Sequence, residues 1–149
     1  MTKVLGSELP QNILNFLRGG QCTVLATASA SGLPYTATMS WVVAKDSKNI
    51  RVAVDRRGQS WFNIQENPLI SLEVLGDDLV VAVRGRASRI REQMDSIPFP
   101  CGIVEIVVEE VIDHSVPGLA LKGPSYIFEP GKEHRYLTEE RVFSELLRA

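Results

Sequence analysis

The sequence predicts a mainly β protein: a small closed or partly closed antiparallel barrel of six strands, with a helix before it and a tail that ends in a helix. Three observations predict this class. Six segments alternate apolar and polar residues, which is the period of a half-buried strand. Short turn sequences such as Ala30-Ser31-Gly32 and Gly76-Asp77-Asp78 separate some of them, which is typical of a meander. So much strand would leave costly open edges, and closure of the barrel or dimerisation removes them.

The first predicted element is a short amphipathic helix near the N-terminus. Ser7 is the candidate N-cap, and Gly19-Gly20 ends the helical pattern. The apolar residues at helical spacing are Leu9, Ile13, Leu14, Phe16 and Leu17.

Six predicted strands follow this helix. They are expected at residues 22–29, 34–44, 50–54, 69–75, 79–90 and 103–113. The fifth is expected to bend near Gly85, because a glycine inside a strand often marks a bend.

Further helices are predicted between and after the strands. A short helix begins near Ser60 and is stopped by Asn67-Pro68, and residues 91–97 are expected to be helical. The tail from Ser115 onward wraps over a surface and ends in a helix over residues 138–148, with Thr138 as its N-cap.

Length and charge restrict the classes of function. A chain of 149 residues suits one compact domain, with residues 1–114 as the barrel and 115–149 as an extension packed on the same domain. A formal net charge of -2 gives no attraction to nucleic acid or to an anionic membrane. The N-terminus has no apolar core of a secretory signal, and no run approaches the ~20 apolar residues of a spanning helix. We therefore expect a cytoplasmic protein with no nucleic-acid or membrane partner.

Motifs of catalysis and metal binding are not found in the sequence. Cys22, Cys101, His114 and His134 lack the close pairs of structural zinc sites, so no metal ligand is assigned. The sequence has no phosphate loop, no dinucleotide-binding glycine motif and no nucleophile elbow. No catalytic side chain is therefore assigned.

One stretch, VDRRGQSWFNIQENP at residues 54–68, suggests a ligand site. It places two arginines, a glycine and a serine between a strand and the start of a helix. A strand that ends in this way can present an anionic ligand to the helix N-terminus. The same residues also suit an ordinary polar connection between two strands, and the residues alone leave both interpretations open.

The ordered set of segments resembles a known family. LPQNILNFLRGGQCTVLATASASGLPYTATMSWVV, IRVAVDRRGQSWFNIQENPLISLEVL and LVVAVRGRASRI together resemble the FMN-binding split barrels, which include pyridoxamine 5'-phosphate oxidase. The resemblance covers roughly residues 9–114. It implies a six-stranded antiparallel split β-barrel and a homodimer that binds FMN at its interface. The apolar strand surface at residues 39–43 and 80–83 predicts that the strands at 34–44 and 79–90 lie near that interface.

The resemblance also implies site residues. It places the flavin ring against Thr38, Met39, Ser40, Trp41, Val42, Ala53 and Val54. In the family, a serine and adjacent basic residues at the start of the short helix hold the phosphate. The basic pair is replaced here by Gln59-Ser60, and Arg56 and Arg57 are the candidates to take its place, since an arginine can bind phosphate through two hydrogen bonds.

The function that the resemblance implies is flavin-dependent electron or hydride transfer, as in an FMN-dependent oxidoreductase, with an unknown substrate. The flavin does this chemistry, so no acid or base from the protein is required. The alternatives are a cofactor-free dimeric module that binds a ligand or a partner, which Gln59-Ser60 favours, and a relative that uses deazaflavin or haem.

Overall fold

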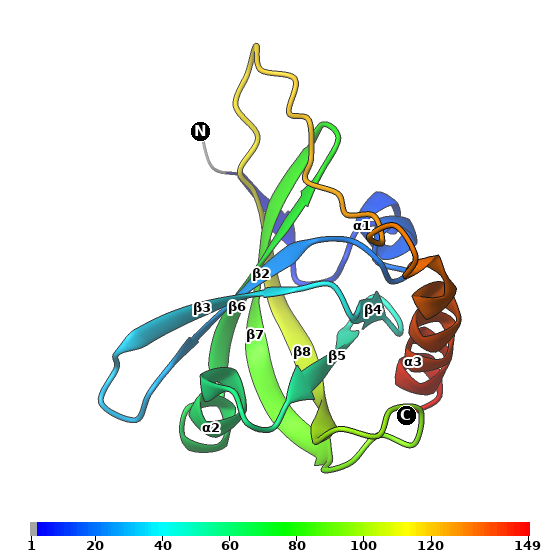
Figure 1. The fold of residues 1–149 in the computed structure, drawn as a ribbon. Coiled ribbons are helices and arrows are strands. Elements are labelled where there is room, and N and C mark those ends of the chain that lie inside the picture. Colours follow the sequence, from blue (N-terminus) through cyan, green and yellow to red (C-terminus); the bar gives the residue numbers. More distant parts are fainter. Residues whose placement is uncertain (1–2) are drawn as a thin grey trace.

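A computed structural model describes residues 3–149 as one strongly curled antiparallel sheet with helices against it (Figure 1). Within these residues, seven strands follow one another in the order β3-β2-β6-β7-β8-β5-β4, and β1 pairs with β8 beside this path. The strands are β1 Lys3–Gly6, β2 Thr23–Ala28, β3 Pro34–Met39, β4 Val42–Ala44, β5 Asn49–Asp55, β6 Leu69–Gly76, β7 Leu79–Arg91 and β8 Cys101–Asp113. The helices are α1 Gln11–Phe16, α2 Gln59–Glu66, the short 3-10 helix Glu133–Arg135 and α3 Tyr136–Arg148.

The predicted class is confirmed as mainly β, with one helix near the N-terminus and one at the C-terminus, but the strand count of six is wrong. The sheet is a half-barrel whose path has seven strands, and β1 is an addition to it. The four residues of β1 were missed because the strand is short and mostly exposed, so it has no apolar alternation.

The predicted strand at 34–44 is two strands. Met39 is the last residue of β3 to pair with β2, opposite Thr23, whereas Val42 pairs with Val52 of β5. β3 and β4 are therefore opposite edges of the curled sheet, and only Ser40 and Trp41 join them. The opening of the half-barrel lies at this junction.

Three local predictions are wrong. Residues 91–97 are not helical: β7 continues to Arg91, and an irregular connection leads to Cys101. The helix caps also differ, because Pro10 rather than Ser7 precedes α1, and α3 follows a 3-10 turn instead of beginning at Thr138.

The predicted bend near Gly85 is confirmed by a register shift. Arg84 pairs with Glu110 but Gly85 pairs with Val108, so one residue of β8 is skipped. A Cβ on Gly85 would collide with the carbonyl oxygen of Val107. Only glycine allows this close approach of the two backbones.

The buried side chains form two clusters on the two faces of the sheet. The larger cluster fills the inside of the curl and includes Leu25, Ile50, Leu72 and Ile106, with residues from α1 and α2 closing its ends. The second lies on the outer face of β4, β5 and β8, where α3 covers it (Figure 1). Its members are Val43, Ala53, Met94, Ile97, Cys101, Ile103, Val142 and Leu146. No helix in residues 3–149 is long and apolar enough to cross a membrane.

Candidate functional site

The turn between β5 and α2 is organised by Asp55. Its carboxylate accepts hydrogen bonds from the backbone N–H of Arg57 at 2.9 Å and from the Nε and Nη2 of the same residue at 2.9 and 2.7 Å. The Arg57 side chain is thus the main reason that the pKa of Asp55 lies below its usual value. Arg57 is therefore an exposed cation whose side chain is held beside the turn by Asp55.

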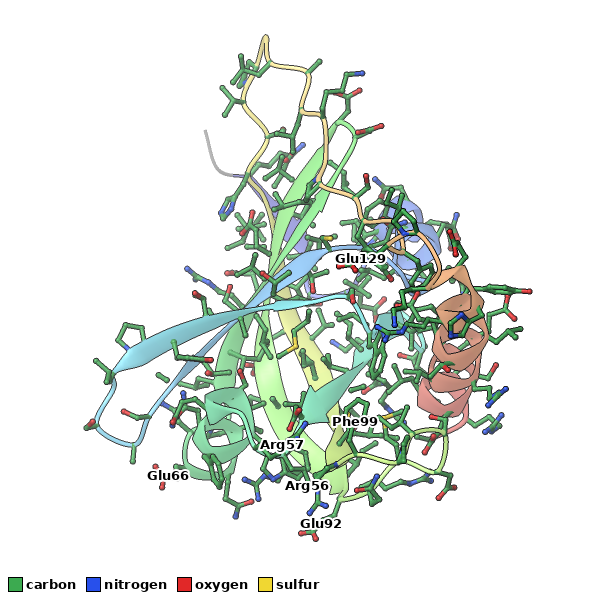
Figure 2. All side chains as sticks on the ribbon, in the orientation of Figure 1. Arg56, Arg57, Glu66, Glu92, Phe99 and Glu129 are labelled. Carbon is green, nitrogen blue, oxygen red and sulfur yellow. The ribbon has the colours of Figure 1, made fainter. Side chains whose placement is uncertain are left out.

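Arg56 lies in the same turn and has a different environment. Its backbone N–H donates to Pro100 at 3.1 Å, and its Nη2 donates to Gln93 at 3.2 Å. Its Nε is buried and has no hydrogen-bond partner among the described residues. Figure 2 shows Arg56 and Arg57 together at the end of β5, and the Arg57 guanidinium carbon lies 5.9 Å from the centre of the Phe99 ring.

The start of helix α2 adds another unsatisfied donor. Gly58 is the N-cap and has no side chain to satisfy the first N–H groups of the helix. Ser60 is 3% exposed, and its hydroxyl has no partner in the part of the chain that the structure describes. Buried polar atoms without partners are rare. The turn therefore has two buried donors without partners close to a helix N-terminus, where the helix dipole favours negative charge.

A cavity of about 200 Å³ opens next to this turn. Its lining residues are Thr38, Met39, Ser40, Trp41, Ala53, Asp55, Phe99 and Cys101. Trp41 and Phe99 stack with their ring centres 6.1 Å apart and their planes at 27°. Asp55 belongs to both the cavity wall and the turn, so the two features adjoin at this residue.

The structure brings most of the residues expected at the flavin ring to this cavity. Thr38, Met39, Ser40, Trp41 and Ala53 line it. Val42 and Val54 do not: they are 1% and 2% exposed and belong to the cluster inside the curl. Successive side chains of a strand point to opposite faces, so Val54, the neighbour of Ala53 in β5, faces the inside of the curl, and Val42 at the start of β4 faces the same way.

The residues expected at the phosphate also fall into two groups by their position and hydrogen bonding. Arg56, Arg57 and Ser60 lie at the turn: the Arg57 side chain is exposed, whereas the Arg56 Nε and the Ser60 hydroxyl are buried, and none of the three lines the cavity. Gln59 is exposed, and its amide donates to Asn63 at 2.9 Å, which in turn donates to Thr27 at 3.0 Å. Gln59 therefore organises the inner side of helix α2.

Several site residues were missed by the sequence analysis. Asp55, Phe99 and Cys101 line the cavity. Tyr126 and Glu139 come from the C-terminal extension: the Glu139 carboxylate accepts from the Trp41 indole at 2.9 Å and from the Tyr126 hydroxyl at 2.9 Å. Asp55 could have been identified from the sequence, because it is the acidic residue directly before the arginine pair. Nothing in the sequence signals the contact between Trp41 and Glu139, which lie 98 residues apart.

Two titratable groups near the cavity, the Cys101 thiol and the Tyr126 hydroxyl, have raised pKa values. Burial raises the pKa of the Cys101 thiol to about 12, and nearby carboxylates add to the effect, so the thiol is neutral. Burial, and then the contact with Glu139, raises the pKa of Tyr126 to about 12, which keeps its hydroxyl protonated as a donor. Within residues 3–149, no three histidine, cysteine or acidic side chains are grouped so as to hold a metal ion.

Comparison with known proteins assigns the chain to a family. Residues 9–99 match the model of the family described as pyridoxamine 5'-phosphate oxidase. None of the curated proteins gives a significant match.

Solved structures of similar fold differ in what their descriptions say they bind. A "putative pyridoxamine 5'-phosphate oxidase" from Lactobacillus delbrueckii has a TM-score of 0.63 and 21% identity, covering 74% of this chain and 98% of its own. An FMN-binding protein from Syntrophomonas wolfei has a TM-score of 0.54 and 16% identity, covering 71% and 84%. The haem storage protein HutZ from Vibrio cholerae has a TM-score of 0.56 and 15% identity, covering 70% and 92%. At such identities these likenesses concern the fold alone.

Proposed function

The chain belongs to the pyridoxamine 5'-phosphate oxidase family, and from this premise we propose that it is an FMN-binding redox protein that acts as a homodimer. The observation that carries the proposal is the pair of buried donors without partners, the Arg56 Nε and the Ser60 hydroxyl, beside a cavity lined by Trp41 and Phe99. FMN has a phosphate for the first feature and a planar apolar ring for the second.

The existing ion pair between Arg57 and Asp55 is compatible with phosphate binding by Arg57. Its pair with Asp55 is exposed, with 65% and 42% of the two side chains accessible to water. Exposed ion pairs add little to stability. Arg57 can therefore exchange one carboxylate oxygen for a phosphate oxygen at little cost, whereas Arg56 and Ser60 gain hydrogen bonds that they lack.

The rest of the site suits a flat ring. Thr38 and Ser40 can offer polar atoms to its edge, while Met39, Trp41 and Phe99 exclude water from its face. Bound FMN would supply electron or hydride transfer, which no side chain of this protein provides by itself. The protein would then contribute orientation and the exclusion of water.

A second copy of the chain is part of the proposal. The cavity of about 200 Å³ is smaller than the roughly 300–1,000 Å³ typical of sites that enclose a ligand of this size. Strand β3 is an edge of the sheet, and its residues are exposed or half-buried, with Tyr35 40% exposed. A partner placed against β3 would cover both the ring and this open edge.

Haem is the second candidate, because one similar structure is a haem storage protein. The described cavity does not favour it. Neither histidine lines the cavity: His114 pairs with Glu73 at 3.3 Å, and His134 lies in the 3-10 turn before α3. Cys101 does line it, but its neutral thiol is a poor iron ligand.

The test compares FMN with riboflavin, which lacks the phosphate, in a flavin-fluorescence titration. The double variant R56A/R57A should bring FMN affinity down towards that of riboflavin, with a loss of about tenfold to a hundredfold for each contact removed. The matched control is R84A/R86A, which removes the same charge from exposed positions on β7. Added salt should weaken FMN binding by the wild type more than by R56A/R57A.

Three outcomes would decide against parts of the proposal. If the wild type binds neither flavin, the turn is a connection between secondary structure elements and the cofactor-free module remains. If R84A/R86A weakens FMN as much as R56A/R57A does, general charge rather than the turn holds the phosphate. If sedimentation of the FMN-loaded protein gives only a species of 16.5 kDa, the homodimer is wrong.

A further inference from the structure

Helix α3 reaches the wall of the cavity through Glu139. This carboxylate accepts a hydrogen bond from the Trp41 indole, and it also holds the hydroxyl of Tyr126. Trp41 lies in the two-residue junction between β3 and β4, where its carbonyl accepts from the Ala53 N–H of β5 at 3.0 Å and its side chain packs against the cluster under α3. The carboxylate fixes the N–H end of the indole, while stacking on Phe99 and packing on the cluster under α3 hold the rest of the ring.

The same helix holds the segment that carries Phe99. Glu145 is only 2% exposed, and it accepts hydrogen bonds from the backbone N–H groups of Asp95 and Ser96, both at 2.8 Å. Arg91 adds an ion pair at 3.1 Å. A buried carboxylate with three donors fixes the connection between β7 and β8 to the end of α3.

Hydrogen bonds within the connection between β7 and β8 extend the constraint from Glu145 to Phe99. The Gln93 amide donates to the carbonyl groups of Met94, Ile97 and Phe99 at 3.1, 3.4 and 3.1 Å. These bonds tie residues 93–99 into one unit. An anchor at residues 95 and 96 therefore also positions the Phe99 ring.

The spacing of the Trp41 and Phe99 rings shows that the two rings contact each other directly. Their centres are 6.1 Å apart, within the range for rings in direct contact. A flat ligand placed between them would need about 7 Å, twice the ~3.5 Å separation of carbon atoms in contact. The pair is therefore closed, and it forms one wall of the cavity.

We propose that helix α3 fixes the Trp41–Phe99 pair through Glu139 and Glu145, and that these two carboxylates are positioning residues which determine how a planar ring fits the cavity. The inference deepens the proposed function and rests on it for the identity of the ring. The match to the family ends at residue 99, so α3 lies outside the matched region. This chain would thus use its C-terminal helix to set the selectivity of a site built on the family barrel.

The experiment distinguishes contacts with the flavin ring from contacts with the phosphate. Glu139→Leu removes the acceptor, Glu139→Gln keeps an oxygen that can accept the indole N–H, and Glu140→Leu is the control on the exposed neighbour. The variant E139L should weaken FMN and riboflavin by the same factor, about fivefold to tenfold, because the ring is common to both. E139Q should recover most of the loss, and E140L should bind both flavins as the wild type does.

The indole N–H resonance of Trp41, assigned by its absence in W41F, gives a readout that needs no flavin. It should shift in E139L and stay near the wild-type position in E139Q and E140L. An unshifted resonance in E139L would overturn the inference whether or not a flavin binds. A shifted resonance with unchanged affinity for both flavins would also overturn it, while leaving the proposed function intact. If the wild type binds no flavin, the proposed function fails, and the resonance alone decides whether α3 holds the pair.

Discussion

Replacing Glu145 with glutamine should destabilise the protein far more than its small change in volume suggests. The wild-type carboxylate satisfies two backbone N–H groups in the connection between β7 and β8 and also pairs with Arg91. The glutamine oxygen can accept from only one of those N–H groups. Its amide N–H₂ then faces the other one, which is left buried without a partner.

The magnitude follows from the orphaned groups. A buried donor left without a partner costs about 1–3 kcal/mol, and the loss of a charge-assisted bond adds to this. The Arg91 contact adds little, since 41% of that side chain is exposed to water. We therefore expect E145Q to lower the free energy of unfolding by about 2–3 kcal/mol. The matched control E140Q changes an exposed residue of the same helix and should stay within about 0.5 kcal/mol of the wild type.

The effect should also depend on pH. Burial alone would raise the pKa of Glu145, but the donors of Ser96, Asp95 and Arg91 outweigh burial and hold the pKa below 4.5. A group whose pKa is lower in the folded state stabilises the protein above its unfolded value and loses that contribution as the pH falls through the folded value. The difference between wild type and E145Q should thus be constant above 4.5 and shrink below it.

Urea unfolding at several pH values measures both effects through the transition midpoint at constant slope. A difference between wild type and E145Q of under about 0.5 kcal/mol at neutral pH would refute the reasoning. So would a difference that grows as the solution is acidified. The first result would mean that the connection finds other acceptors, and the second that Glu145 is not ionised in the folded protein.

Other changes test the site and the sheet. Ser60→Ala should leave the unfolding midpoint unchanged or raise it, because a buried hydroxyl without a partner is lost, while FMN binding in the fluorescence titration becomes weaker. A thiol reagent at mildly alkaline pH should label the half-buried Cys22 and reach Cys101 only in urea, since the pKa of Cys101 is about 12; equal labelling rates in the folded protein would contradict this. Gly85→Ala should cost about 1–3 kcal/mol in urea unfolding, because its Cβ would meet the Val107 carbonyl, whereas Ser88→Ala on the exposed side of β7 should cost under about 0.5 kcal/mol.

Most of the sheet could be predicted from the sequence because alternation is a local signal. Strands β5, β6, β7 and β8 begin and end within two residues of the predicted bounds. The segment at 34–44 was misread because its alternation continues across Ser40 and Trp41, while its pairing partner changes from β2 to β5. A change of partner is a property of the sheet, and the segment itself carries no sign of it.

The site was predictable only in part for a related reason. Resemblance to a family names a continuous run of residues, but a strand turns alternate side chains away, as it does for Val42 and Val54. The carboxylate that accepts from the Trp41 indole comes from the extension beyond the family match. Glu139 could not be assigned from sequence, because its contact depends on how α3 packs against β4 and β5.

Strand β8 has a consequence for the way the chain folds. It pairs with β1, β5 and β7, which come from the beginning, middle and later parts of the sequence. The hairpins β2–β3, β4–β5 and β6–β7 can form locally, but the curl closes only when β8 joins the last two of them. Folding that waits for such distant pairings takes milliseconds to seconds, and the amides of β8 should exchange hydrogen only through global unfolding. The turn at residues 55–60 follows β5 directly, so the ligand site should assemble in this late, cooperative step.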